Sequence, residues 1–155
     1  MKQGVIVTGA SSGIGLATVR LLAEKGYGVV GMARSKKPEV LEKYAQWGAV
    51  YSQGDVICAE DRARALKTAQ EAFGNVYALV NVAGVAPKVR ADILEMTEES
   101  YDTVMNINTK GMMFMTQLVA RAMLAQPRGE GLRGAIVNIS SMSAYTSSIS
   151  RGEYC

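Results

Sequence analysis

The segment VIVTGASSGIG, residues 5–15, decides how this chain begins to fold. Its first three residues, Val5 to Val7, have the pattern of a buried strand, and a Gly/Ser turn follows them. A helical pattern of apolar positions then runs from Ile14 to Lys25. A strand, a glycine-rich turn and a helix in this order are typical of a phosphate-binding site, because N–H groups and the positive end of the helix dipole face the anion.

Each glycine of this turn has a place in such a site. Gly9 allows a tight turn out of the strand, Gly13 lets the backbone approach a pyrophosphate, and Gly15 allows close packing of the helix on the sheet. For the glycines alone, a flexible turn without a ligand is the alternative. The strand before them and the amphipathic helix after them favour a dinucleotide site.

Apolar segments with the pattern of strands alternate with helical segments along the rest of the chain. We expect strands at 29–32, 49–51, 77–80 and 135–139, and helices at 40–47, 60–73 and 98–124. The strands are apolar on both faces, which indicates a parallel sheet covered by helices on both sides. Right-handed crossovers then predict one doubly wound α/β domain over residues 1–155, with strand order 3-2-1-4-5 and ligands at the carboxyl ends of the strands.

The composition bounds the function. The 155 residues are 48% hydrophobic and 20% charged, which is ordinary for a globular domain. The net charge of +3 comes without a long run of one sign, which argues against nucleic acid as the partner. With no histidine and only Cys58 and Cys155, we expect no metal site and no disulfide framework, and we expect Cys58 to be a small, buried or half-buried apolar residue.

The start of the chain and its hydropathy predict a location. Residues 1–7 lead into Gly and Ser too soon for a signal peptide. No apolar run approaches the roughly 18 residues of a membrane span. We therefore expect a cytoplasmic protein with no membrane partner.

Four ordered motifs resemble those of the short-chain dehydrogenase/reductase family. They are TGASSGIG (8–15), NVAG (81–84), NINTKG (106–111) and IVNISS (136–141), with Val82 in place of the family's second Asn. The spacing of the first motif differs from the Gly-x-Gly-x-x-Gly of most dinucleotide enzymes. The resemblance implies a Rossmann-type oxidoreductase, most similar to 3-oxoacyl-(acyl-carrier-protein) reductases, and a homodimer or homotetramer.

The end of the second expected strand predicts the cofactor. Residues 31–37, GMARSKK, contain no acid, whereas NAD enzymes place one here to hold the ribose 2′-hydroxyl. Arg34 offers a charge-assisted fork for a 2′-phosphate, and Ser35 offers a further donor. We predict NADP(H). The alternative is a solvated Arg34 in an enzyme that binds NAD(H) through other contacts.

The resemblance implies further cofactor residues. Asp55 and Val56, at the end of the third expected strand, match the family's adenine-contacting pair, with a simple strand-ending Asp as the alternative. The full set of expected cofactor residues is Gly9, Ser11, Ser12, Gly13, Ile14, Gly15, Arg34, Ser35, Asp55, Val56, Asn81, Ala83 and Gly84.

The resemblance also implies the catalytic residues. Carbonyl reduction needs a proton donor and a group that holds the oxygen, for which the family uses a Tyr and a Ser, with an Asn that anchors a relay water. Tyr154 lies 13 positions after Ser141, the family's usual spacing, whereas Ser140 gives 14 and Tyr145 is too close. We therefore predict Asn108, Ser141 and Tyr154 as the catalytic residues.

The family's fourth catalytic residue is a Lys that lowers the pKa of the Tyr, and it falls at position 158, beyond Cys155. The family continues with a helix, two strands and a substrate lid. We therefore expect the sequence to be part of a longer protein, to expose an apolar patch on its sheet, and to have little turnover alone.

Two functions compete at this point. The first is an oxidoreductase that reduces a small-molecule carbonyl to an alcohol, with a carrier-bound 3-oxoacyl thioester as one substrate class. The second is a non-catalytic dinucleotide-binding sensor or assembly module, and a Lys at position 158 would favour the enzyme. Lys88 and Arg90 either meet an acidic carrier protein or lie in a solvated loop.

The methionines of the 98–124 helix have two readings as well. They either pack in the core and between helices, or form an adaptable partner surface; they are Met112, Met113, Met115 and Met123.

Overall fold

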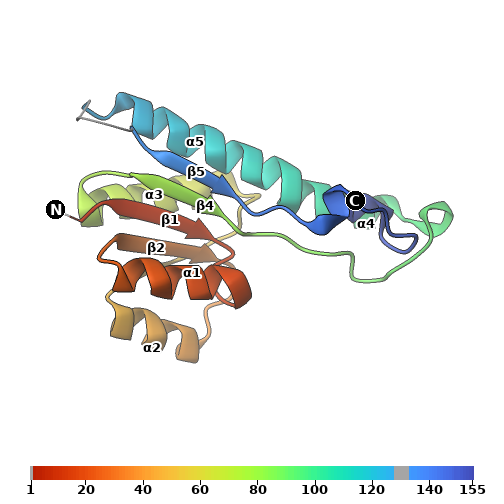
Figure 1. The fold of residues 1–155 in the computed structure, drawn as a ribbon, viewed down its shortest axis with the longest axis horizontal. Helices are drawn as coiled ribbons and strands as arrows, with labels where there is room; N and C mark the ends of the chain where they lie inside the picture. The colour runs from red at the N-terminus through yellow and green to blue at the C-terminus, as the bar shows by residue number, and fades with distance from the viewer. Residues whose placement is uncertain (1, 128–132) are drawn as a thin grey trace.

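The computed structural model describes residues 2–127 and 133–155 (Figure 1). Within these residues, five strands form one parallel sheet in the order β3-β2-β1-β4-β5, so the predicted fold class and strand order are confirmed. The strands are β1 (Gly4–Thr8), β2 (Gly28–Ala33), β3 (Val50–Gln53), β4 (Ala78–Asn81) and β5 (Ala135–Asn138).

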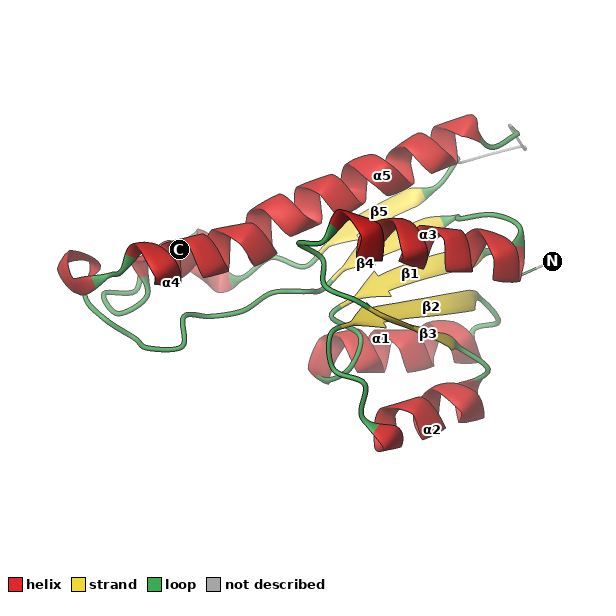
Figure 2. Ribbon diagram, turned by 180° about the vertical axis from the view of Figure 1, so that it is seen from behind, coloured by secondary structure: helices red, strands yellow, loops and turns green. Residues whose placement is uncertain are grey.

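Helices α1 (Gly13–Glu24), α2 (Pro38–Trp47), α3 (Ala59–Phe73) and α5 (Met112–Ala125) cover the two faces of the sheet. Helix α4 (Glu98–Met105) lies beyond the carboxyl end of the sheet. Figures 1 and 2 show α1 and α2 on one face, and α3 and α5 on the other. The chain supplies their ends locally: Pro38 begins α2, and Gly48 and Gly74 take left-handed backbone angles after α2 and α3. None of the described helices has the length and apolar character needed to cross a membrane.

Two apolar layers hold the helices on the sheet, because successive strand residues point to opposite faces. One layer lies between the sheet and α3 and α5, and its largest buried members include Ile6, Met32, Leu79 and Met115. The other layer lies between the sheet and α1 and α2, and includes Val5, Val7, Val19, Val29 and Tyr44. The central strand β1 is buried along its whole length, which is why its sequence is apolar without alternation.

Strand β5 differs from the other strands. We expected it to be buried on both faces, but Ile136 is 37% exposed and Val137 is 46% exposed. Ile136 pairs with Leu79 and Val137 with Val80, so β5 lies in register at the edge of the sheet. The sheet therefore exposes apolar side chains along this strand.

The predicted helical stretch from Glu98 to about Leu124 is helical throughout, and its pitch changes at one place. A turn of π-helix, Asn106–Gly111, joins α4 to α5. Met115 and Met123 are buried in the core, as the packing interpretation expects, whereas Met113 is 57% exposed. Core packing therefore explains only part of the methionine-rich stretch.

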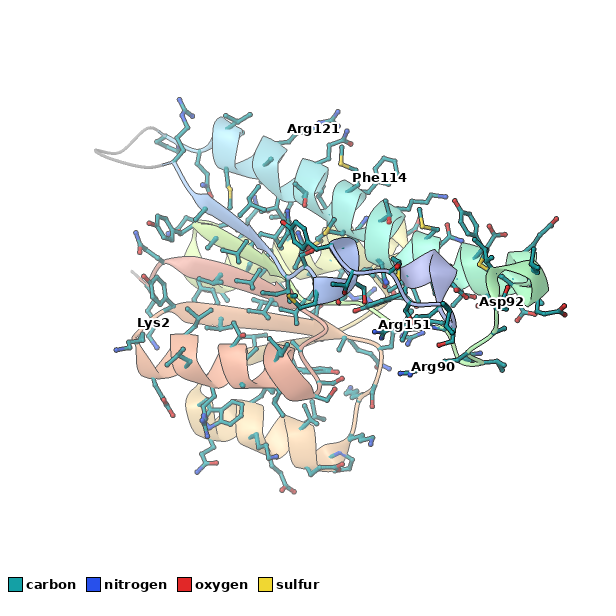
Figure 3. All side chains as sticks on the ribbon, turned by 45° about the vertical axis from the view of Figure 1, so that its right-hand side comes forward. Lys2, Arg90, Asp92, Phe114, Arg121 and Arg151 are labelled. Atoms are coloured by element: carbon teal, nitrogen blue, oxygen red, sulfur yellow. The ribbon has the colours of Figure 1, made fainter. Side chains whose placement is uncertain are left out.

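The outer surface of α5 also contacts α3. Phe114, labelled in Figure 3, projects from α5, and the guanidinium of Arg62 on α3 lies 5.7 Å from the centre of its ring. Arg62 also donates a hydrogen bond to the carbonyl of Val56 at 2.6 Å, which ties α3 to the end of β3.

Beyond the carboxyl end of the sheet, α4 and the end of the chain lie side by side (Figure 1). The side chain of Thr97 accepts a hydrogen bond from the N–H of Ser100 and begins α4. The hydroxyl of Ser100 donates to the carboxylate of Glu153, so α4 is bonded to the final turn of the chain.

Gln126 joins the end of α5 to the segment before β4. Its Oε1 accepts from the N–H of Val76 at 2.6 Å, and its Nε2 donates to the carbonyl of Val76 at 3.1 Å. Val76 is fully buried, so water cannot replace either bond.

We expect Gln126→Ala to lower the free energy of unfolding by about 2 kcal/mol, because it leaves two backbone groups of a buried residue without partners. Urea denaturation followed by far-ultraviolet circular dichroism measures the change. Gln117→Ala, an exposed position on the same helix, serves as the control and should change stability by less than about 0.5 kcal/mol. Equal losses for the two variants would contradict the bridging role of Gln126.

Candidate functional site

A cleft of about 670 Å³ lies where β1, β2, β3 and β4 end. Its walls come from the glycine-rich turn after β1, the loop after β2, residues 54–56 after β3 and residues 82–85 after β4. Every predicted cofactor residue except Asn81 lines it, and these are Gly9, Ser11, Ser12, Gly13, Ile14, Gly15, Arg34, Ser35, Asp55, Val56, Ala83 and Gly84. The sequence did not single out Met32, Ala33, Gly54, Val82, Val85 and Ile107, which line it as well.

Close backbone packing forms the floor of the cleft. Gly9 has a φ of +64°, and a β-carbon at this position would lie 2.8 Å from the Cα of Ala83. A β-carbon at Gly15 would lie 2.8 Å from the carbonyl carbon of Gly9. Only glycine fits at these two positions, so the turn leaves main-chain N–H groups exposed to an anion at the start of α1.

Thr8 fixes the distance between the ends of β1 and β4. Its Oγ1 accepts hydrogen bonds from the N–H groups of Val82 and Ala83, both at 3.1 Å. Thr8 itself is 1% exposed, so its hydroxyl bonds to the protein and not to bulk water. Thr8 belongs to the first motif, but nothing in the sequence reveals that it contacts a segment more than 70 residues away.

Asn81 lies outside the cleft and supports it from below. Its Nδ2 donates to Oδ1 of Asn138 at 2.9 Å and to Oγ1 of Thr116 at 3.0 Å. The side chain is buried, and these bonds join β4 to β5 and to α5. The Asn81 side chain therefore joins neighbouring elements beneath the cleft, and its contact with a cofactor stays a prediction.

Arg34 is available to bind an anion. Its side chain is 64% exposed, and its Nη1 lies 3.9 Å from Oδ2 of Asp55. An exposed ion pair of this length contributes little to stability, so the guanidinium can exchange this carboxylate for a phosphate at small cost. The backbone beneath it is held, because Nε2 of Gln53 donates to the carbonyl of Arg34 at 3.1 Å.

The loop that carries Asp55 is held by Asp61, in the first turn of α3. The N–H of Asp55 donates to Oδ2 of Asp61 at 2.7 Å, and this bond, with help from Arg64, holds the pKa of the Asp61 carboxyl below its usual value. Sequence analysis did not identify Asp61. An acid at the first turn of a helix beside a site loop was the available signal.

Cys58 lies in the same loop and is half-buried, as we expected. Its Sγ also donates to Oε2 of Glu60 at 3.0 Å, and this bond lowers the pKa of that carboxyl.

In the part of the chain that the structure describes, no three His, Cys, Asp or Glu side chains lie where they could hold a metal ion.

Asn108 lies in the π-helical turn and bonds to the loop after β4. Its Oδ1 accepts from the N–H of Val85 at 2.8 Å, and its Nδ2 donates to the carbonyl of Val85 at 2.9 Å. Turns of π-helix are frequent at functional sites because they redirect the residues they contain. Here the turn directs the Asn108 amide to the rim of the cleft.

Ser141 and Tyr154 lie on the segment that follows β5. Oγ of Ser141 accepts from the N–H of Ser143 at 3.2 Å and begins a short 3₁₀ helix, Met142–Ala144. Tyr154 lies in the 3₁₀ turn Gly152–Tyr154. Among the described residues, no hydrogen bond joins the side chains of Asn108, Ser141 and Tyr154.

Arg151 is a neighbour of Tyr154 that sequence analysis missed. Its guanidinium lies 5.4 Å from the centre of the Tyr154 ring, and Figure 3 shows it at the end of the molecule that also carries Arg90 and Asp92. The geometry is that of a cation–π contact, which places positive charge beside the phenol.

A second hollow, of about 280 Å³, lies between the loop after β4, α4 and the final turn. Lys88, Glu99, Ser100 and Glu153 are among its lining residues. Arg90 is exposed nearby on the same loop, so both basic residues of this loop are accessible.

The profile of the short chain dehydrogenase family matches residues 3–155, so the chain belongs to this family. The 2-dehydro-3-deoxy-D-gluconate 5-dehydrogenase of Dickeya dadantii is 34% identical over 146 residues, which cover 93% of this chain and 55% of that protein. The chain therefore spans little more than half the length of this relative.

Solved structures give the same result. A 3-oxoacyl-[acyl-carrier protein] reductase from Brucella melitensis in complex with NAD superimposes with a TM-score of 0.90 at 32% identity, over all of this chain and 62% of the other. An actinorhodin polyketide ketoreductase with NADPH superimposes with a TM-score of 0.88 at 28% identity, over 99% of this chain and 58% of the other. The first of these agrees with the predicted resemblance to 3-oxoacyl reductases.

Thr8→Val tests the bond between β1 and β4. The change keeps the shape of the side chain but leaves the N–H groups of Val82 and Ala83 without an acceptor, so we expect it to lower the free energy of unfolding by about 2–4 kcal/mol. Chemical denaturation measures this loss. Thr8→Ser keeps the oxygen and is the control; if Ser destabilises as much as Val, packing of the methyl group outweighs the hydrogen bonds.

Proposed function

We propose that this chain forms the cofactor-binding part of an NADP(H)-dependent oxidoreductase that interconverts a carbonyl and an alcohol. The observation that carries the proposal is the single cleft that joins the glycine cradle to Arg34. Because the chain spans only part of its relatives' length, the reaction is proposed for the whole protein that contains residues 1–155.

The residues of the cleft fit a phosphorylated dinucleotide. The N-terminus of α1 and the turn at Gly9 suit a pyrophosphate, and Asp55 and Val56 suit the adenine end. Arg34 and Ser35 provide donors for a 2′-phosphate, and residues 31–37 contain no acid that would repel it. One solved relative carries NAD and the other carries NADPH, so the relatives do not decide between the two cofactors. The proposed preference for NADP(H) therefore rests on Arg34.

The glycine-rich turn and Arg34 would hold the cofactor, whose nicotinamide would supply a hydride to the carbonyl carbon when bound. The chain's own residues complete the reduction: the Ser141 hydroxyl donates a hydrogen bond to the carbonyl oxygen, and the Tyr154 phenol gives its proton to the oxygen as negative charge develops there. One hydride and one proton convert the carbonyl to an alcohol. Asn108 holds the loop after β4 through Val85, which keeps the rim of the cleft in place during the reaction.

The names of the relatives support a substrate class. One relative is a 2-dehydro-3-deoxy-D-gluconate 5-dehydrogenase, and another is a 3-oxoacyl-[acyl-carrier protein] reductase. A small carbonyl or alcohol is common to both, and a 3-oxoacyl thioester is the substrate that we propose to test first. Lys88 and Arg90 are exposed on the loop after β4, which supports contact with an acidic carrier, and we propose a homodimer or homotetramer for the whole protein.

Arg34→Glu tests the cofactor. A carboxylate at this position repels a 2′-phosphate and accepts a ribose 2′-hydroxyl, so we expect NADPH to bind at least 10-fold more weakly and NADH to bind as well or better. Fluorescence titration of each cofactor measures the two affinities. Lys25→Glu, the same charge reversal at the opposite end of α1, should leave both unchanged. Wild-type protein that binds NADH as tightly as NADPH, together with an Arg34→Glu variant of unchanged NADPH affinity, would refute the assignment.

Tyr154→Phe and Ser141→Ala test the reaction in the whole protein. We expect each to lower kcat by about 100-fold or more with a 3-oxoacyl thioester and NADPH, because each removes a group that acts on the developing alkoxide. NADPH affinity should stay within about twofold of wild type. Tyr145→Phe and Ser140→Ala make the same chemical changes at neighbouring positions outside the predicted catalytic set and are the controls. Tight NADPH binding with no turnover on any carbonyl substrate would favour a sensor or assembly module.

A further inference from the structure

A glycine in the middle of the sheet makes room for a buried tyrosine. Gly31 of β2 pairs with Val7 of β1 and with Tyr51 of β3, so it lies in the interior of the sheet. A β-carbon at Gly31 would lie 2.6 Å from Cζ of Tyr44 and would overlap its hydroxyl. The absence of that carbon lets Tyr44, from α2, place its hydroxyl against the sheet beneath the cleft.

The hydroxyl of Tyr44 holds the glycine-rich turn. It donates to the carbonyl of Ala10 at 2.8 Å, and Tyr44 is only 2% exposed. The N–H of Ala10 donates in turn to the carbonyl of Met32 at 3.2 Å. The peptide groups on both sides of Ala10 are therefore fixed, and Ala10 stands between Gly9 and Ser11, which line the cleft.

A second tyrosine holds the loop that carries Arg34. The hydroxyl of Tyr51 donates to the carbonyl of Ser35 and lies 3.3 Å from the carbonyl of Ala33. The side chain of Gln53, two residues further along β3, bonds to the carbonyl of Arg34 between them. The backbone on which Arg34 and Ser35 are presented is thus fastened to β3.

The two tyrosines also contact each other. Their rings meet edge to face with centroids 5.0 Å apart, an arrangement that is favourable for aromatic pairs. Burial raises the pKa of both phenols, with the neighbouring Tyr51 adding to the effect on Tyr44. Both hydroxyls therefore keep the proton that they donate throughout the physiological range.

We propose that Tyr44 and Tyr51 are positioning residues for the dinucleotide, Tyr44 for the pyrophosphate cradle and Tyr51 for the 2′-phosphate loop. The inference rests on the proposed binding of NADP(H) in this cleft. A Gly- and Ser-rich turn loses conformational freedom when it binds a ligand, and this loss weakens binding. Hydrogen bonds that order the turn beforehand reduce the loss, so cofactor affinity depends on side chains that do not line the cleft.

The test uses Tyr44→Phe, Tyr51→Phe and the double variant of the whole protein that contains residues 1–155, with NADPH and NADH titrated separately. We expect Tyr44→Phe to weaken both cofactors about equally, by about 3- to 10-fold, because both contain the pyrophosphate. Tyr51→Phe should weaken NADPH by a similar factor and NADH by less, because only NADPH carries the 2′-phosphate. Tyr27→Phe, a half-buried tyrosine that stacks on Tyr77, is the matched control and should change neither affinity.

For Tyr51→Phe, the ratio of NADPH to NADH affinity separates positioning from general destabilisation, because loss of folded protein lowers the number of sites but leaves this ratio unchanged. For Tyr44→Phe, the affinity per folded molecule makes the separation. Far-ultraviolet circular dichroism measures the folded fraction, because Trp47 contacts Tyr44 and its fluorescence would respond to the substitution itself. Folded Tyr44→Phe with wild-type affinity for both cofactors would overturn the role of Tyr44, and an unchanged ratio in Tyr51→Phe would overturn the role of Tyr51. Wild-type protein that binds NADH and NADPH equally refutes the NADP(H) preference and the role of Tyr51 but leaves Tyr44 to be judged on both ligands. Wild-type protein that binds neither refutes both proposals.

Discussion

The cleft depends on two positions where a β-carbon cannot exist. At Gly9 the backbone touches that of Ala83, and at Gly15 it touches that of Gly9, so the exits of β1 and β4 and the start of α1 meet without side chains between them. Thr8 uses the same close approach to accept two N–H groups from the β4 exit. The floor of the site is therefore main chain, whose donors need no side-chain ordering when an anion binds.

The order of the strands brings loops that are distant in the sequence together at the cleft. With β1 in the interior, the loops after β2 and β4 flank the glycine-rich turn, and the loop after β3 comes next. Each loop is then fastened by a side chain from a buried or half-buried element: Asn108 holds Val85, Asp61 holds Asp55, and Tyr51 holds Ser35. Arg34 differs from these groups because its side chain is 64% exposed and its ion pair with Asp55, at 3.9 Å, is weak.

Periodicity and the order of the motifs predict the sheet, the strand order and nearly the whole lining of the cleft. They do so because strand and helix patterns are local and because strand ends converge in any doubly wound sheet. Contacts such as Thr8 with Ala83, or Tyr44 with Ala10, join segments whose spacing carries no signal. The exposure of β5 agrees with the apolar patch that we expected on the sheet. The bonds of Asn81 to Asn138 and Thr116 join distant segments, which local sequence does not specify.

The π-helical turn Asn106–Gly111 contains one residue more than an α-helical turn of the same direction would need. Removing one residue from an ordinary α-helix rotates everything after it by about 100°, which here would swing Met115 and Val119 out of the core. A π-helical turn already contains the surplus residue, so a deletion within Asn106–Gly111 can be absorbed by return to α-helical geometry while α4 and α5 keep their inward faces. Such a deletion would keep the inward faces of both helices and would cost the hydrogen bonds between Asn108 and Val85.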